Sequence, residues 1–116
     1  MASMQHVGER AVGADGTFVV GPHGIIEDVD AGGCRLFGYS RDELVGIHGS
    51  ELIPPAARPA TAVSLDRMRR GELAVRHGSV LRSDGTVIEC EVSARQLPEG
   101  RIALSLRRLA TTESRT

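Results

Sequence analysis

The feature that most constrains the fold of this chain is an alternation of apolar and polar residues between positions 86 and 97. One phase holds Ile88, Cys90, Val92 and Ala94, and the other holds Val87, Glu89, Glu91, Ser93 and Arg95. Because successive side chains of a strand point to opposite faces, the pattern predicts a strand with one buried face. Ser83-Asp84-Gly85 precedes it as a turn sequence, so residues 72–82 are predicted to be its antiparallel hairpin partner.

Three further strands are predicted on similar grounds. Residues 17–20 and 25–29 are rich in β-forming side chains, and the turn sequence 21–24, Gly-Pro-His-Gly, joins them as a hairpin. Residues 101–109 follow a turn at 98–100 and place Ile102, Leu104 and Leu106 on one face. Strands joined by tight turns run antiparallel, and one apolar face per strand requires cover on one side. The sequence therefore predicts an α+β domain with helices packed on one face of the sheet.

Helices are predicted between the two groups of strands. Asp30 is a suitable cap for a short helix that Gly38 ends, and Ser40 with Glu43 has the spacing of a capping box. Pro54 and Pro55 then suit the start of a longer helix that runs to about residue 70, before Gly71. Within it, Ala60, Val63 or Ser64, and Met68 recur at helical spacing and predict its inner face.

Size and charge exclude several classes of protein. With 116 residues the chain has the length of one domain, which we place at residues 16–110, after a leader at 1–15 and before a polar tail at 111–116. Fourteen basic and fifteen acidic residues give a net charge of -1 with scattered arginines, which argues against nucleic acid as a partner. Neither a membrane-length apolar run nor the pattern of a signal peptide is present, so we expect a cytoplasmic protein without membrane contact.

Catalytic and metal-binding patterns are missing from the sequence. It contains no nucleophile with an adjacent base, no phosphate-binding loop and no His, Cys and Asp set at ligand spacing, so neither an enzyme nor a metal site is predicted. Cys34, beside Arg35, is predicted to be a small side chain on a short helix rather than a reactive group. Cys90 lies on the apolar phase of its strand, where burial raises the pKa of a thiol.

Three motifs in order resemble the PAS domains, the small modules of sensory proteins. They are GIIEDVDAGGCRLFGYSRDELVG at 24–46, MRRGE at 68–72 and LRSDGTVIECEVSARQLPEG at 81–100, so the resemblance covers about 16–110. It implies a PAS fold, with a five-stranded antiparallel sheet, short helices and one longer helix around a small hydrophobic pocket. Two positions depart from the family pattern: Asp30 stands where Asn is usual, and residues 107–110, Arg-Arg-Leu-Ala, lack an acidic residue.

The resemblance also implies a pocket in which family members bind haem, flavin or small metabolites. Haem is disfavoured because the predicted long helix contains no His to serve as the axial ligand. Flavin is disfavoured because aromatic residues make up 3% of the chain, Asn is absent, and Cys34 lies out of register with the cysteine of flavin-binding relatives. The expected ligand is therefore a small, mainly apolar molecule rather than a cofactor.

The side chains predicted to line this pocket share an inward orientation. They are Leu36, Phe37, Leu44, Ile53, Val63, Met68, His77, Ile88, Cys90, Val92, Ile102 and Leu104. Two alternatives stay open: these residues enclose a cavity, or they pack against one another as a filled core. His77 also has two options, because the alternation of residues 72–82 does not decide whether its side chain points inward or outward.

The sequence thus predicts a sensory or regulatory module that relays a signal through dimer or partner contacts. The outer face of the sheet carries partly apolar positions such as Val87 and Ala103 between charges, which favours a homodimer. An effector domain or a signalling protein is the other expected partner. The alternative is a PAS module without a ligand that serves only dimerisation or protein interaction.

Overall fold

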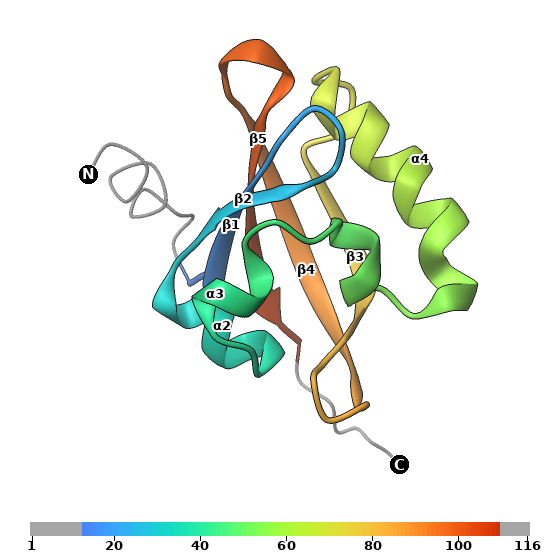
Figure 1. Cartoon of the computed structure of the whole chain (residues 1–116). Coiled ribbons are helices and arrows are strands. Elements are labelled where there is room, and N and C mark those ends of the chain that lie inside the picture. Colours follow the sequence, from blue (N-terminus) through green and yellow to red (C-terminus); the bar gives the residue numbers. More distant parts are fainter. Residues whose placement is uncertain (1–12, 110–116) are drawn as a thin grey trace.

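The computed structural model describes residues 13–109 and consists of one sheet with helices on one of its faces (Figure 1). All strand pairs are antiparallel, and the spatial order is β2-β1-β5-β4-β3. The elements in chain order are β1 (Gly16–Val20), β2 (Ile26–Val29), α2 (Ala31–Phe37), α3 (Arg41–Leu44), η1 (Gly49–Leu52), η2 (Pro55–Ala57), α4 (Arg58–Arg69), β3 (Val75–Leu81), β4 (Val87–Gln96), η3 (Pro98–Gly100) and β5 (Ile102–Arg108). The predicted α+β class with a five-stranded antiparallel sheet is confirmed.

The strand pairing decides which side chains reach the core. Ile88 and Cys90 of β4 are 4% and 0% exposed, which confirms the apolar phase predicted for this strand. In the register with β3, Val80 lies opposite Ile88 and Gly78 lies opposite Cys90. Since directly opposed residues of an antiparallel pair share a face, Val80 and Gly78 also point toward the helices.

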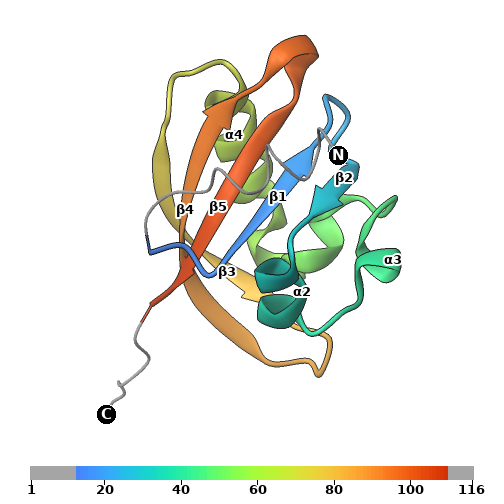
Figure 2. The same cartoon turned by 90° about the vertical axis from the view of Figure 1, so that its left-hand side faces the viewer.

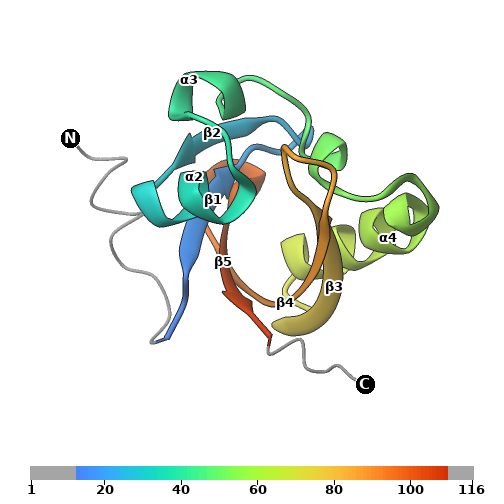
Figure 3. The same cartoon turned by 90° about the horizontal axis from the view of Figure 1, so that it is seen from below.

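The helices form two groups over the sheet. Helices α2 and α3 lie against β1 and β2 at one edge of the sheet. Helix α4 covers the same face of the sheet but lies against β3 and β4, at the other edge (Figures 1 and 3). Figure 2 shows the molecule turned so that β4, β5, β1 and β2 lie across the view, with α4 behind them. The loops between α3 and α4 bridge the two groups, so the inner face of the sheet is enclosed from several directions.

Helices α2 and α3 begin where the sequence predicts. The carboxylate of Asp30 accepts hydrogen bonds from the backbone N–H of Gly33 at 2.8 Å and of Thr17 at 3.0 Å, so it caps α2 and ties it to β1. Gly38 ends α2 with φ of 82°, a left-handed conformation that favours glycine. The capping box is complete, with Ser40 Oγ accepting from the Glu43 N–H and the Glu43 carboxylate accepting from the Ser40 N–H.

Glycines bring α2 into direct backbone contact with β1. A Cβ atom on Gly16 would lie 2.4 Å from the backbone nitrogen of Gly33 and 2.8 Å from the carbonyl carbon of Gly32. A Cβ atom on Gly33 would lie 2.6 Å from a methyl group of Val29. The glycines at 32 and 33, in the first turn of α2, therefore allow this helix and β1 to pack closely.

The longer helix begins later than predicted. Pro55 starts a short 3-10 turn, and the α-helix proper begins at Arg58 and ends at Arg69.

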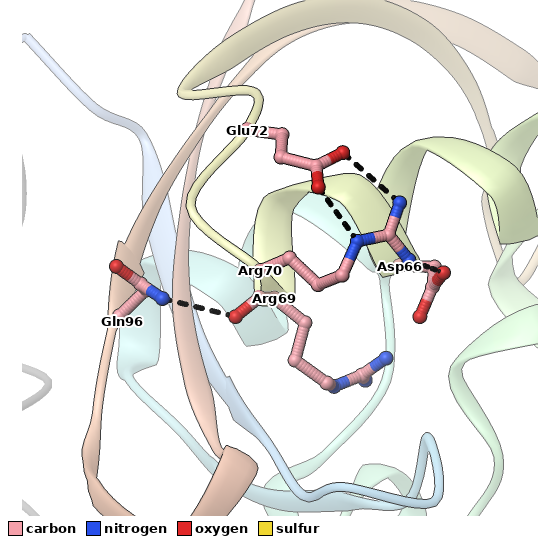
Figure 4. A network of polar contacts seen from close by, with 5 residues as sticks. All are labelled: Asp66, Arg69, Arg70, Glu72 and Gln96. Atoms are coloured by element: carbon pink, nitrogen blue, oxygen red, sulfur yellow. Dashed lines mark hydrogen bonds and ion pairs between the residues drawn. The ribbon is translucent and has the colours of Figure 1, made fainter.

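Figure 4 shows how the end of α4 is fixed: the side-chain amide of Gln96 donates to the carbonyl of Arg69 at 3.0 Å, which joins α4 to β4. Arg70 pairs with Glu72 at 2.9 Å and with Asp66 in the same network. The Arg69 guanidinium donates to the carbonyls of Gly21 and Gly100, so the end of α4 is also bound to the turn after β1 and to the turn before β5.

An ion pair attaches α3 to the edge strand. The Asp28 side chain is 1% exposed and accepts from Arg41 Nη2 at 2.8 Å and Nε at 3.2 Å. This contact raises the pKa of the Arg41 guanidinium, chiefly through its hydrogen bond to Asp28. Leu44, 0% exposed, is the apolar anchor of the same short helix.

The predicted leader and tail lie outside the described residues, apart from positions 13–15. From residue 13 to residue 109, the chain contains no helix that is long and apolar enough to span a membrane.

Candidate functional site

A cavity of about 130 Å³ lies between the inner face of the sheet and the helices. Strand residues form its floor, and η1 and the first turns of α4 form its opposite wall. The apolar side chains around it are Phe18, Val20, Ile26, Phe37, Leu52, Ile53, Ala62, Leu65, Val80, Val92, Leu104 and Leu106. An apolar cavity of about 150 Å³ is large enough to hold a ring of six carbon atoms, so this one has room for a small ligand.

Small residues on several elements leave this volume open. Gly78 of β3 and Ala62 of α4 line it, as do Gly24 after β1 and Gly49 at the start of η1. Gly78 is the most informative of them because the neighbouring inward positions of the sheet carry side chains and this one carries none. A glycine inside a strand often marks a place where a ligand or another backbone comes close.

Polar groups lie at the edge of the cavity. His48 caps η1, with Nδ1 accepting from the Ser50 N–H at 3.1 Å and lying 2.9 Å from Ser50 Oγ. Arg58 donates from Nε to the carbonyl of Ile53 at 3.1 Å, and Arg76 donates from Nε to the carbonyl of His77 at 3.0 Å. His48, Ser50, Arg58 and Arg76 all line the cavity. The site is therefore apolar inside and basic at its rim.

The predicted site residues divide into three groups. The first group lines the cavity and comprises Phe37, Ile53, Val92 and Leu104. The second group is buried as predicted but packs in the filled core and does not line the cavity; it comprises Leu36, Leu44, Met68, Ile88, Cys90 and Ile102. The cavity is lined in part by small residues, whereas the larger side chains of the second group fill the space around them. Both alternatives left by the sequence are thus realised, in different parts of the interior.

The third group, Val63 and His77, does not face the interior, so their assignment to the lining is wrong. For His77 the structure has the outward one of the two orientations that the sequence left open. Val63 is 62% exposed, because it lies five residues before buried Met68 and a helix turns by about 100° per residue. The inner face of α4 follows Arg58, Thr61, Leu65 and Met68 instead.

His77 points outward because it pairs with Glu91, which lies on the outward phase of β4. Its side chain is 64% exposed, and Nε2 lies 3.7 Å from the Glu91 carboxylate. Arg107 pairs with the same carboxylate at 2.9 Å and, more than any other group, lowers its pKa. His77 therefore belongs to a charged cluster on the outer face and contributes nothing to the cavity.

Some of the lining residues that were not predicted carried a usable signal in the sequence. Phe18 and Val20 are two residues apart in the first strand, so their side chains point to the same face of the sheet, and both line the cavity. Gly78 interrupts a predicted strand, which is itself a sign of a close approach or a ligand. Arg58 and Arg76 carried no such signal, because a charged side chain is expected at the surface.

Neither cysteine lines the cavity. Cys34 is partly buried on α2, and burial, followed by the nearby Asp30 carboxylate, raises the pKa of its thiol. Cys90 is 0% exposed, and burial raises the pKa of its thiol to about 11. The burial and raised pKa predicted for Cys90 are confirmed, and both thiols are protonated at neutral pH.

The side chains with nitrogen, oxygen or sulfur atoms in the lining decide which groups the cavity could hold. His48 is the one histidine among the described residues that line the cavity, and its Nδ1 is engaged with Ser50. Among the described residues, this lining contains no Asn, Gln or Cys. Over residues 13–109, no cluster of three or more His, Cys, Asp and Glu side chains could hold a metal ion.

The outer face of the sheet is only partly apolar. Val75 and Val87 are 47% and 50% exposed, and Val87 pairs with Leu81 across the hairpin. Ala103, which was predicted to contribute to this surface, is 4% exposed. It is a small side chain on the central strand between Val19 and Arg95, its partners on the two neighbouring strands, so it offers no contact surface.

Comparisons with known proteins agree with this architecture. The sequence profile described as PAS domain matches residues 14–107. Among solved structures, a domain of a sensory box sensor histidine kinase/response regulator from Geobacter sulfurreducens is 28% identical, with a TM-score of 0.75 and coverage of 91% of this chain and 93% of that one. Among curated protein sequences, none matches the chain significantly.

Two more distant structures share the fold. The PAS domain of a protein from Colwellia psychrerythraea is 16% identical, with a TM-score of 0.74 and coverage of 94% of this chain and 98% of that one. The PAS domain of a LuxR-family transcriptional regulator from Burkholderia thailandensis, solved in complex with ethanol, is 19% identical, with a TM-score of 0.69 and coverage of 83% and 89%. With its profile match over most of its length and its five-stranded sheet, the chain belongs to the PAS domain family of sensory and signalling modules.

Proposed function

We propose that this PAS domain is a sensor that binds a small, mainly apolar ligand in the cavity between the sheet and α4. Occupancy of the cavity is relayed through contacts of the domain with a second copy or with a signalling protein in the cytoplasm. The module itself has no catalytic role, and neither haem nor flavin is its ligand. The ligand is bound reversibly, by burial of its apolar surface.

The observation that carries this proposal is the open apolar volume of about 130 Å³ in the interior. Protein interiors are packed nearly as densely as organic crystals, so an open volume of this size is uncommon in a core that has only to be stable. The buried side chains around it, including Phe18, Leu52 and Val80, offer apolar contacts on several sides. The ethanol complex of the Burkholderia thailandensis relative supports a small ligand in this fold.

A titration with 1-pentanol followed by ¹H–¹⁵N NMR tests the proposal. We expect saturable shifts of the amide signals of Phe37, Leu52, Val80 and Leu104, because these residues line the cavity. Gly78→Val places methyl groups into the open volume, and the first added atom would lie 3.3 Å from Nη2 of the Arg76 side chain. We expect this variant to keep its fold and to lose the saturable shifts.

His77→Val is the matched control, since it introduces the same side chain on the same strand at an outward position. It should bind 1-pentanol as the unchanged protein does. The proposal fails if the unchanged protein shows no saturable shifts, or if Gly78→Val binds the alcohol with unchanged affinity.

The alternative function is a module that acts through protein contacts without a ligand. The exposed side chains of Val75 and Val87, with the partly buried Leu81 opposite Val87, favour it, because exposed apolar side chains on a sheet are suited to a partner surface. Sedimentation over a wide concentration range tests this surface. Dimers that dissociate in Val87→Glu, combined with no alcohol binding, would replace the proposed function by this alternative.

A further inference from the structure

One of the basic side chains at the cavity, Arg76, lies on β3 next to Gly78. Arg76 and Gly78 occupy neighbouring inward positions, and the Arg76 guanidinium extends toward the space that a Gly78 side chain would take. A Cβ atom on Gly78 would lie 3.3 Å from Arg76 Nη2 and 3.5 Å from Cζ and Nε. The guanidinium therefore forms part of the wall at the point where the strand itself leaves the volume open.

Arg76 is held by backbone carbonyls instead of by an acidic side chain. Its Nε donates to the His77 carbonyl at 3.0 Å, and Nη1 lies 3.5 Å from the Ala60 carbonyl of α4. In the described part of the chain, no carboxylate lies within ion-pair distance of Arg76 or Arg58. By contrast, Arg101 and Arg107 on the outer face and edge pair with Glu27 and Glu91.

The lining as a whole is complementary to a negative charge. Between residues 13 and 109 it contains two arginines and a histidine but neither Asp nor Glu. Two positive groups at the rim of an apolar cavity attract a ligand that is anionic at one end and aliphatic at the other. A guanidinium binds a carboxylate through paired, charge-assisted hydrogen bonds, and this geometry suits arginine better than lysine.

We propose that the ligand is a small aliphatic monocarboxylate whose carboxylate binds the Arg76 guanidinium and whose tail fills the apolar cavity. This inference rests on the proposed function, because it specifies the ligand of the same cavity. Arg76 is the principal contact, since the carbonyls of His77 and Ala60 hold its guanidinium at the wall. Arg58, an exposed residue at the start of α4, adds positive charge at the rim.

Binding of sodium pentanoate and of 1-pentanol at neutral pH, measured by NMR titration, tests this assignment. The two probes share the same aliphatic chain and differ in the charged group. We expect the unchanged protein to bind pentanoate more tightly than the alcohol. In Arg76→Met, pentanoate should bind about tenfold or more weakly, equivalent to ~1.4 kcal/mol, while the affinity for 1-pentanol stays the same. Arg76→Lys keeps the charge without the paired donors and should give an intermediate loss.

Arg67→Met is the control, since it removes an exposed arginine from α4 that does not line the cavity. It should leave both affinities unchanged, and thermal unfolding of each variant verifies that the fold is retained. Equal affinity of the unchanged protein for both probes, or unchanged pentanoate binding in Arg76→Met, overturns the carboxylate assignment and leaves the proposed function standing. Failure of both probes to bind overturns the two proposals together.

Discussion

Gly16→Ala is expected to destabilise this domain by about 3 kcal/mol or more, the upper part of the range for overpacked interiors. The added methyl group would lie 2.4 Å and 2.5 Å from the backbone nitrogen and Cα of Gly33. Backbone atoms cannot move aside by a change of rotamer, so α2 as a whole has to shift away from β1. That shift would stretch the hydrogen bonds from the Thr17 and Gly33 N–H groups to Asp30, which join the same two elements.

Urea denaturation followed by circular dichroism measures this effect as a lower midpoint. Gly49→Ala is the matched control, because its added methyl group would lie 3.6 Å from the nearest atom, the Gly24 carbonyl oxygen, which is an ordinary contact. The control should unfold close to the unchanged protein. If Gly16→Ala also unfolded at the same midpoint as the unchanged protein, the close approach of α2 and β1 described above would be wrong.

Phe37→Ala is expected to cost about 3–5 kcal/mol, the usual range for a large aromatic side chain removed from a core. Phe37 is 2% exposed and packs edge-to-face on Phe18, with ring centroids 4.9 Å apart and an angle of 89° between the rings. Its carbonyl also accepts from the Ser83 N–H at 2.8 Å, which ties α2 to the hairpin between β3 and β4. The substitution removes the ring from the cavity wall and leaves this backbone bond in place.

The loss is measured as the free energy of unfolding, and it amounts to a large part of the ~5–15 kcal/mol by which single domains are stable. Phe37→Leu retains most of the apolar volume and should cost less than half as much. Because Phe37 lines the cavity, its removal in Phe37→Ala enlarges the cavity, and the folded Phe37→Ala protein should also bind larger apolar molecules such as benzene. A cost below about 1 kcal/mol for Phe37→Ala would show that the ring is not part of the core.

Local signals explain why much of the fold could be predicted. The Asp30 cap, the Gly38 stop and the Ser40–Glu43 capping box each depend on residues within a few positions of one another, and all three are present. The inward phase of β4 was also predictable, because Ile88 and Cys90 alternate with charged residues. The start of α4 was placed too early because Pro55 suits the first turn of a 3-10 helix as well as that of an α-helix.

The site was harder to predict because it depends on contacts between distant segments. Strand β3 has no clear alternation of its own, so the inward positions of Gly78 and Arg76 are fixed only by pairing with β4. Val63 was misplaced because the helix offers several weak apolar stripes, and only contact with the sheet selects the one through Leu65 and Met68. The cavity itself requires small residues from β3, α4 and η1 to face one another.

The sequence by itself determined the order of the elements, their caps and turns, the antiparallel hairpins and the family of the domain. These properties follow from neighbouring residues, whose hydrogen bonds and periodicity are the same in any chain of this pattern. The tertiary structure decided which apolar residues fill the core and which surround an open volume, and it placed Arg76 and Arg58 at the rim of that volume. An open volume is the space left after segments far apart in the sequence have packed, so the periodicity of any one segment does not contain it.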